Sequence, residues 1–325
     1  VGYRSQFSHP FARSDRPSQY FDFAGRTAFM IGMQGETLIG PSHWFGEVAR
    51  APGGAFGGLG GVDAELTDGI ETIVLARHYP RDFASLYGHA YGASGGPQNE
   101  TGVYTALRLR RFEGWDLAAS FDQFWFPWLR YNIGRPTSGY AAALATTYEP
   151  QDDLEIYLRF RSSVREQSAQ YPDRSGMIRG VAPAVRQTLR LQITYAPTDK
   201  WRFRTRTELS RAETVESQTH FGSLLYQDIR WHPLSTLRLD GRITLFHAED
   251  YAARLYAYEN DLLYGFSVPV LYGRGQRAYL LTAWEITEGI VLEGKYAISR
   301  YLDRKTVGSG WDEVSGNRLR EVRLQ

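Results

Sequence analysis

Hydrophobic and polar residues alternate with a period of two along most of this chain, and helical periodicity is almost absent. In residues 237–245, leucine and isoleucine alternate with arginine and aspartate. The same arrangement recurs in residues 154–161, 186–195, 201–210 and 290–299. Alternation of this kind predicts β-strands that each carry one apolar face and one charged face.

The pattern predicts fifteen strands, separated alternately by tight turns and by longer connections. The predicted strands cover residues 25–34, 42–50, 57–66, 70–77, 103–112, 115–125, 138–148, 154–163, 184–196, 201–211, 220–231, 236–246, 275–286, 290–300 and 319–325. The longer connections include residues 78–101, 164–183 and 247–274. Because single-chain bacterial barrels have an even number of strands, we expect a sixteenth strand in residues 1–24, with residues 19–23 as the candidate, or before the chain given.

These features predict an all-β fold, an antiparallel up-and-down transmembrane β-barrel of about 16 strands, as a single domain over residues 1–325. A soluble propeller or sandwich also has alternating strands, but both faces of a propeller blade are largely buried. Strands of about 9–11 residues match the tilted crossing of a bilayer. Aromatic residues at strand ends are typical of a girdle at the headgroup level. The predicted girdle residues are Trp115, Trp125, Trp201, Trp231 and Trp284.

Composition excludes several other classes of protein. The 325 residues contain no cysteine, 17 phenylalanines, 8 tryptophans and 21 tyrosines. A disulfide scaffold and a thiolate site are therefore excluded, and the aromatic content disfavours disorder. The 37 basic residues balance 36 acidic ones, which gives no general attraction to nucleic acid. Residues 1–24 contain no signal peptide, so we expect the chain to be a mature or partial form, with these residues as an extra strand or a periplasmic or lumenal segment.

Several segments resemble the barrel part of Bacteroidota-type outer-membrane proteins, which carry a helix-hairpin-helix module before a large barrel. They are YAYENDLLY (256–264), GFSVP (265–269), YGRG (272–275), GSGWDEVSGN (308–317), FGEVAR (45–50), FWFPWLR (124–130) and YQDIR (226–230). The resemblance implies the bacterial outer membrane as the location. The module is absent from this chain, and DNA binding would belong to it, so we expect this segment to bind no nucleic acid.

The charged faces of the predicted strands are rich in arginine and would line a barrel lumen. The predicted lining residues are Arg159, Arg161, Arg190, Arg204, Arg206, Arg238, Arg242, Glu208, Asp240 and Glu293, and Arg202, Asp122 and Asp228 project to the same side. One interpretation is a lining that attracts anions. The favoured alternative is a polar interior in which arginines and carboxylates of neighbouring strands pair with each other.

Two further segments have compositions that suggest a functional or a packing role. The long connection that follows residue 248 contains six aromatic residues, and we expect Tyr256, Tyr258, Glu259 and Tyr264 to form a gating or partner-binding loop. Such a loop would fold inward as a plug, bind a partner at the surface, or extend the wall as a hairpin. Residues 53–61 contain six glycines, which do not match a phosphate-binding loop and would allow close packing against the wall.

The sequence thus predicts a channel, or the barrel subunit of an envelope transport complex. The first alternative is a structural or interaction barrel with a plugged lumen that conducts nothing. The second is an outer-membrane hydrolase, for which no catalytic residue stands out, because His220 and Ser223 lie three apart on one strand and so face opposite sides. No metal site and no cofactor is predicted. The expected partners are outer-membrane lipid, lipopolysaccharide and envelope proteins.

Overall fold

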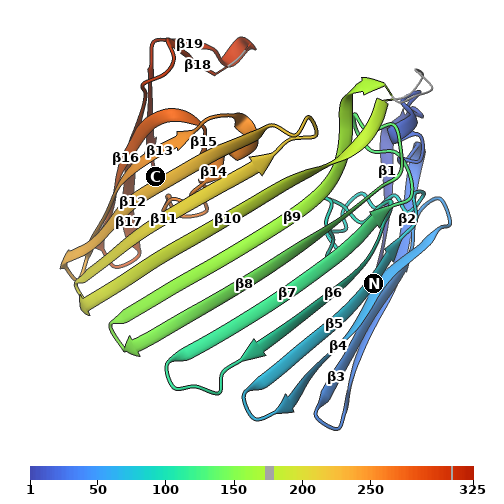
Figure 1. Cartoon of the computed structure of the whole chain (residues 1–325), viewed down its shortest axis with the longest axis horizontal. Coiled ribbons are helices and arrows are strands. Elements are labelled where there is room, and N and C mark those ends of the chain that lie inside the picture. Colours follow the sequence, from blue (N-terminus) through green and yellow to red (C-terminus); the bar gives the residue numbers. More distant parts are fainter. Residues whose placement is uncertain (173–178, 309) are drawn as a thin grey trace. The chain divides into compact units, whose positions relative to one another are not determined.

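The computed structural model describes residues 1–172, 179–308 and 310–325 (Figure 1). Sixteen strands form one antiparallel sheet in which each strand pairs with the next one along the chain. The strands are β1 (Gly2–Phe11), β2 (Gly25–Ile39), β3 (Ser42–Arg50), β4 (Phe56–Thr67), β5 (Ile70–Tyr79), β6 (Glu100–Leu109), β7 (Trp115–Phe126), β8 (Thr137–Gln151), β9 (Leu154–Pro172), β10 (Arg179–Thr198), β11 (Trp201–Glu213), β12 (Thr219–Leu234), β13 (Leu237–Ala248), β16 (Gly273–Thr287), β17 (Ile290–Tyr301) and β20 (Arg318–Leu324). The predicted all-β, antiparallel, up-and-down arrangement of sixteen strands is confirmed.

Short turns and long connections alternate along this sheet, as predicted. The two-residue turns after β4 and β16 each contain a glycine with positive φ, Gly69 at 70° and Gly289 at 80°. That region of backbone conformation favours glycine, which explains why Asp-Gly and Glu-Gly signal these turns in the sequence. The long connections carry the smaller elements. These are η1 (Pro17–Gln19), η2 (Tyr251–Ala253), β14 (Leu255–Tyr256), β15 (Val270–Leu271), β18 (Thr306–Val307), η3 (Gly310–Asp312) and β19 (Val314–Ser315).

Two sequence-based predictions about the strands are wrong. The sixteenth strand, β1, lies within residues 1–24 as expected, but the candidate residues 19–23 begin with the last residue of a 3₁₀ helix, which has Pro17 at its start and backbone bonds from Gln19 to Arg16 and from Tyr20 to Pro17. These local bonds engage groups that a strand would need for its ladder. The connection predicted at 164–183 is also too long, because β9 continues to Pro172 and β10 begins at Arg179. Residues 173–178 of that connection, and Ser309 of the 308–317 segment, lie outside the described residues.

The chain divides into two compact units. Unit 1 comprises Val1–Leu144, Arg161–Val185 and Thr214–Ser217, and unit 2 comprises Ala145–Phe160, Arg186–Glu213 and Gln218–Gln325. Unit 1 contains β1 to β7, and unit 2 contains β11, β12, β13, β16, β17 and β20. The prediction of a single domain stays a prediction.

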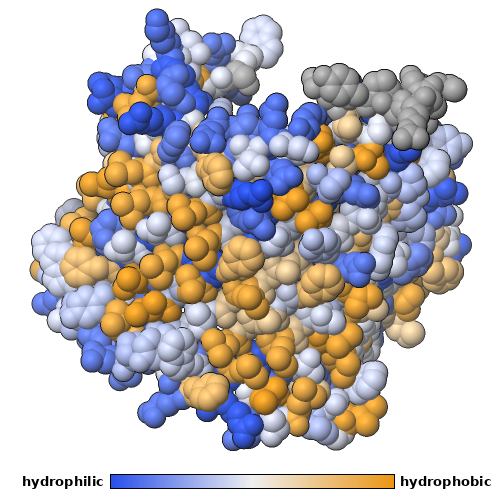
Figure 2. Space-filling view, viewed as in Figure 1, coloured by the Kyte–Doolittle hydropathy of each residue, from blue (hydrophilic) through white to orange (hydrophobic). Residues whose placement is uncertain are grey.

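The burial of the strands of unit 2 is inverted relative to a soluble protein. On β13, Asp240 and Arg242 are 2% and 3% exposed, whereas their neighbour Ile243 is 64% exposed. The exposed face continues on the paired strands with Leu225 and Leu280. Figure 2 shows hydrophobic side chains, in orange, gathered at the surface over the strands. The charged face is therefore the packed one, and the apolar face is left open.

No helix among residues 1–172, 179–308 and 310–325 is long and apolar enough to cross a membrane.

Candidate functional site

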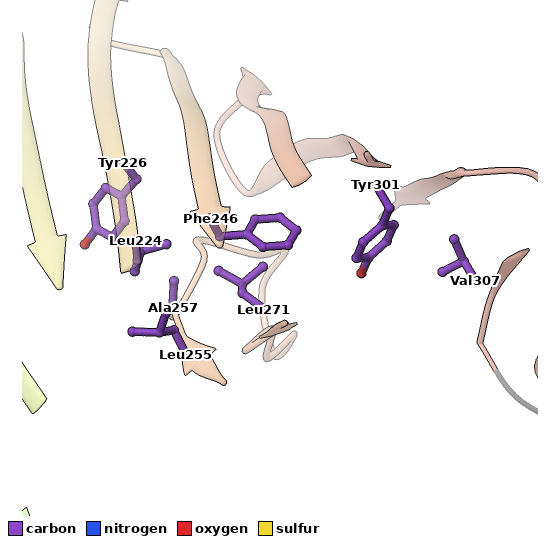
Figure 3. Packing of buried hydrophobic residues seen from close by; sticks show 8 residues of the cluster. All are labelled: Leu224, Tyr226, Phe246, Leu255, Ala257, Leu271, Tyr301 and Val307. Atoms are coloured by element: carbon purple, nitrogen blue, oxygen red, sulfur yellow. The ribbon is translucent and has the colours of Figure 1, made fainter. Parts of the chain in front are cut away.

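The loop at residues 249–272, which joins β13 to β16, lies on the charged face of unit 2 and is the first part of the candidate site. An apolar cluster anchors it: Leu255, Ala257 and Leu271 of the loop pack with Leu224 of β12 and Phe246 of β13 (Figure 3). Tyr226, Tyr301 and Val307 complete the cluster. Short pairing between β14 and β15 holds the two arms of the loop together. Of the three alternatives for this loop, folding inward onto the strands is the one that these contacts within unit 2 support.

Two arginines of the wall bind backbone carbonyls of this loop. Arg206 Nη2 donates to the carbonyl of Tyr256 at 3.1 Å, and Arg242 Nη1 donates to the carbonyl of Tyr258 at 2.6 Å. Both guanidiniums are almost fully buried. Because a buried charged donor is costly to leave unpaired, these contacts fix the path of the loop across β11 and β13.

Glu259 is the centre of the docked loop. Its carboxylate, 1% exposed as a residue, accepts bonds from Arg277 Nε at 2.7 Å and Arg277 Nη2 at 2.9 Å. Lys295 Nζ lies 3.3 Å from the same carboxylate. Burial alone would raise the pKa of Glu259, but the bonds and charge of Arg277 and the charge of Lys295 hold this pKa below its ordinary value. The loop therefore supplies an ionised carboxylate to a cationic wall.

Three further polar contacts surround Glu259. Asn260 Nδ2 donates to Asp240 Oδ1 at 3.2 Å, and Asp261 is bound by Arg323 of β20. The backbone N–H of Leu263 donates to Glu293 of β17. The loop thus contacts β13, β17 and β20 as well as the strands named above. Of the predicted loop residues, Tyr256, Tyr258 and Glu259 take part in docking, whereas Tyr264 is 94% exposed and points away.

Unit 1 contains a second inward loop, at residues 80–99 between β5 and β6, over a buried ion-pair cluster. Arg77 of β5 binds Glu100 of β6, with Nε 2.6 Å from Oε1, and Asp122 of β7, with Nη1 2.8 Å from Oδ1. Glu100 also accepts bonds from the backbone N–H groups of Ala93 at 2.7 Å and Ser94 at 2.8 Å. Loop 80–99 is thus held by its own backbone donors on a carboxylate of the wall.

The glycine-rich segment forms the floor on which this loop packs. Phe83 is buried against Gly57, where a Cβ atom would lie only 2.9 Å from the ring. Tyr79 packs beside Phe83 at a ring separation of 6.1 Å and donates its hydroxyl to the carbonyl of Tyr91 at 3.0 Å. The interpretation that these glycines allow close packing against the wall is supported at Gly57. Burial raises the pKa of Tyr91 in this loop to about 12.

The predicted lumen-lining arginines are mostly paired. Arg190 and Arg206 both bind Glu208, Arg242 binds Asp228 through two bonds, and Arg238 lies 3.0 Å from Asp240 and 3.8 Å from Glu293. This agrees with a polar interior that satisfies itself. Arg161 is exposed.

Not every arginine on the charged face is paired. Among the described residues, Arg159, Arg202 and Arg204 have no hydrogen bond or ion pair to an acidic side chain, and the Nε atoms of Arg159 and Arg204 are buried without a partner. The charged face of unit 2 therefore retains surplus positive charge.

The predicted girdle tryptophans lie exposed at or near strand ends. Trp201 at the start of β11 pairs in register with Trp231 near the end of β12, and the two rings stack at 5.1 Å. Trp284 lies near the end of β16, on the same short-turn side, and Trp115 begins β7. Trp125 lies at the opposite end of β7. Their role at a lipid interface stays a prediction.

Sequence reasoning missed several residues of both loops' anchors, namely Arg77, Glu100, Arg277, Lys295 and Arg323. Each of these residues lies on a strand and follows the alternation. The sequence therefore indicates which face of the sheet its side chain lies on, but not which residue it pairs with. Among the described residues, no group of three or more histidine, aspartate or glutamate side chains is arranged to hold a metal ion.

Comparison with known proteins gives neither a matching family model nor a matching curated protein. Among solved structures, the chain is similar to a loop-deletion mutant of OmpT, an outer membrane protein of Vibrio cholerae, with 10% identity, TM-score 0.44, and coverage of 99% of this chain and 95% of that one. A mutant of the Rh. blastica porin gives 11% identity, TM-score 0.36, and coverage of 91% and 90%. A mutant of the ferric enterobactin receptor PfeA of Pseudomonas aeruginosa gives 12% identity, TM-score 0.42, and coverage of 89% and 55%. Scores this low do not identify a function.

Proposed function

We propose that this chain is a bacterial outer-membrane β-barrel that acts as a channel for small solutes. The observation that carries the proposal is the inverted burial of the strands, with aliphatic side chains exposed and charged ones packed. In water, an exposed apolar face of this extent is unfavourable, whereas in a bilayer it is the expected outer wall.

Strand number and loop placement support a channel rather than a small closed barrel. Barrels of 16–18 strands leave an aqueous path, whereas about eight strands enclose only side chains. Loop 249–272 docks on β11, β13, β16 and β17, and its contacts leave Arg159 on β9 without a loop partner. Surplus arginines of this kind would face water and favour anions.

A second candidate is a structural or interaction barrel that conducts nothing. The tight pairing of buried charges favours it, because Arg77 with Glu100 and Asp122, and Arg277 with Glu259, resemble the cross-links of a plugged interior. In both candidates the chain is not an enzyme, and the partners are outer-membrane lipid and lipopolysaccharide, with envelope proteins as further partners.

Single-channel recording in planar bilayers distinguishes the two candidates. The test variant is Arg204→Glu, which reverses a surplus charge, and the matched control is Arg108→Glu, which reverses a charge of unit 1 that is paired with Asp116. A channel is expected to give discrete current steps with a preference for anions that Arg204→Glu weakens or reverses and Arg108→Glu changes less. Absence of steps from all three proteins would contradict the channel and favour the non-conducting barrel.

A further inference from the structure

A small polar cavity lies on the charged face of unit 2, near the short turns that precede β11 and β13. Its volume is about 60 Å³, and the loop residue Asn260 forms part of its lining. The charged side chains around it are Arg202, Arg204, Arg230, Asp228 and Asp240. Three guanidiniums, two from β11 and one from β12, thus line the cavity.

The register of β11 and β12 places two of these guanidiniums directly opposite each other. Arg202 pairs with Arg230 across the two strands, and Arg204, two residues along the same face, pairs with Asp228. Like charges that face each other across a sheet destabilise it. An antiparallel pair that keeps arginine at both positions therefore needs a compensating negative charge.

The carboxylates near the cavity are already bound, Asp228 by Arg242 and Asp240 by Arg230 of the cavity itself. Both oxygens of Asp228 are bound by Arg242, and Asp240 accepts from Arg230 Nε at 2.6 Å and from Asn260 while lying 3.0 Å from Arg238.

Glu155, the remaining carboxylate that acts on Arg202, accepts a long bond of 3.5 Å from Thr194. Arg202 and Arg204 have no ion pair of their own among the described residues, and Arg204 Nε is buried without a hydrogen-bond partner. The five arginines around the cavity, Arg202, Arg204, Arg230, Arg238 and Arg242, thus share four carboxylates, Asp228, Asp240, Glu155 and Glu293.

We propose that Arg202, Arg204 and Arg230 form a binding site for one small free oxyanion, such as inorganic phosphate. Guanidiniums bind phosphate and carboxylate oxygens through paired N–H groups, so one anion can bridge Arg202 and Arg230 and engage Arg204. The cavity volume suits a single small anion. A free anion is favoured over a lipid headgroup because the site lies on the charged face, opposite the exposed Ile243 and Leu280.

The site does not depend on conduction. Phosphate binding without ionic current would support the site and contradict the channel. Ionic current without phosphate binding would support the channel and contradict the site. The two proposals therefore fail separately.

Isothermal titration of the full chain in lipid-free detergent micelles at low ionic strength, with inorganic phosphate as the titrant, tests the site. Saturable binding at one site is expected, with Arg202→Gln and Arg204→Gln each weakening it by about tenfold or more, as expected for loss of a charge-assisted contact. Arg159→Gln is the matched control, because it removes the same charge from the same face of unit 2 outside the cavity, and less than about twofold change is expected.

Arg202→Gln removes the repulsion from Arg230, so this variant is expected to fold at least as well as the natural chain. Absence of phosphate binding to the natural chain would overturn the inference. Equal weakening by all three variants would overturn it too, since that is the behaviour of a diffuse positive field. Equal affinity for chloride, or binding of dihexanoyl phosphatidylglycerol instead of phosphate, would also contradict a free oxyanion site.

Discussion

In unit 1 the buried ion pairs lie within the wall, whereas in unit 2 they join the wall to the loop. Arg77, Glu100 and Asp122 come from three adjacent strands, and loop 80–99 adds only neutral donors to Glu100. In unit 2 the carboxylate of Glu259 is in the loop and its cations, Arg277 and Lys295, are in the wall.

The difference separates two ways of holding a loop inside a polar interior. Charges that pair within the wall stay paired if the loop leaves, so such a loop depends on packing and on hydrogen bonds, among them one from Arg165 to the carbonyl of Ala93 at 3.0 Å. A wall that keeps surplus cations depends on its loop for neutralisation, and docking then responds to pH and salt. We expect loop 80–99 to be a fixed part of unit 1 and loop 249–272 to be the responsive element of unit 2.

The largest effect is expected from Arg77→Ala in unit 1. Removing this side chain leaves Glu100 and Asp122 buried without their cation, which should cost about 3–5 kcal/mol of unfolding free energy. Urea titration of the refolded chain in detergent, followed by tryptophan fluorescence, measures it. A loss below about 1 kcal/mol, the range of an exposed ion pair, would contradict the buried triad.

Glu259→Gln in unit 2 is expected to reduce the unfolding free energy less than Arg77→Ala does, and to release loop 249–272 from the strands. Arg277 keeps Glu321 at 2.8 Å and Lys295 keeps Asp261 at 3.7 Å, so the cost should be about 1–3 kcal/mol. Limited proteolysis between Leu262 and Tyr264 should accelerate, while cleavage within loop 80–99 should not. Equal acceleration of cleavage in both loops would mean that loop 249–272 does not depend on Glu259 more than loop 80–99 does.

Acid should release the same loop without mutation. Because the pKa of Glu259 is lower in the folded protein, its contribution to stability is present above the unfolded pKa of about 4.5 and is lost as pH falls through the folded value. Cleavage of loop 249–272 by pepsin, compared between pH 5 and pH 2, should rise more in the natural chain than in Glu259→Gln. An equal rise in the two proteins would exclude Glu259 as the titrating group.

A more modest effect tests the packing that holds loop 80–99. Gly57→Ala places a methyl group 2.9 Å from the ring of Phe83 and should cost about 1–3 kcal/mol through overpacking. Gly60→Ala is the matched control, because its Cβ would make an ordinary contact of 3.6 Å. Denaturant midpoints of the two variants measure the difference. Equal midpoints would mean that Phe83 does not pack on Gly57.

The smallest effect is expected from Arg108→Gln, which breaks the exposed pair with Asp116. Exposed ion pairs contribute about 0–1 kcal/mol, so the urea midpoint should barely move. A loss of unfolding free energy comparable to that of Arg77→Ala would show that solvent exposure does not decide how much these two arginines contribute to stability.

Alternation along the chain was enough to predict the sheet, fifteen of its strands and the faces of residues such as Arg206 and Ile243, whereas the sixteenth strand was expected from the even strand number of bacterial barrels. The strands it placed wrongly alternate less cleanly: on β1 the face of Tyr3, Phe7 and Phe11 also has Ser5 and His9, and residues 164–169 of β9 have polar residues on both faces. Period-two reasoning needs one apolar face, so it loses such strands.

The candidate site was only partly predictable for a different reason. The six aromatics of loop 249–272 indicated that the loop would not be a plain surface loop, but nothing in the sequence distinguished docked Tyr256 from exposed Tyr264. Pairings such as Arg277 with Glu259, and the opposition of Arg202 and Arg230, depend on register and on the path of a loop. Neither follows from periodicity.

Contact of the apolar face with lipid and of the charged face with water can be tested on two neighbouring residues of β9. The chain contains no cysteine, so Leu158→Cys and Arg159→Cys each introduce one thiol, on the exposed apolar face and on the charged face respectively. The measurement is the rate of labelling by a water-soluble maleimide after reconstitution into phospholipid vesicles. We expect fast labelling of Arg159→Cys and protection of Leu158→Cys. Fast labelling of both thiols, or protection of Arg159→Cys alone, would contradict these assignments of the two faces.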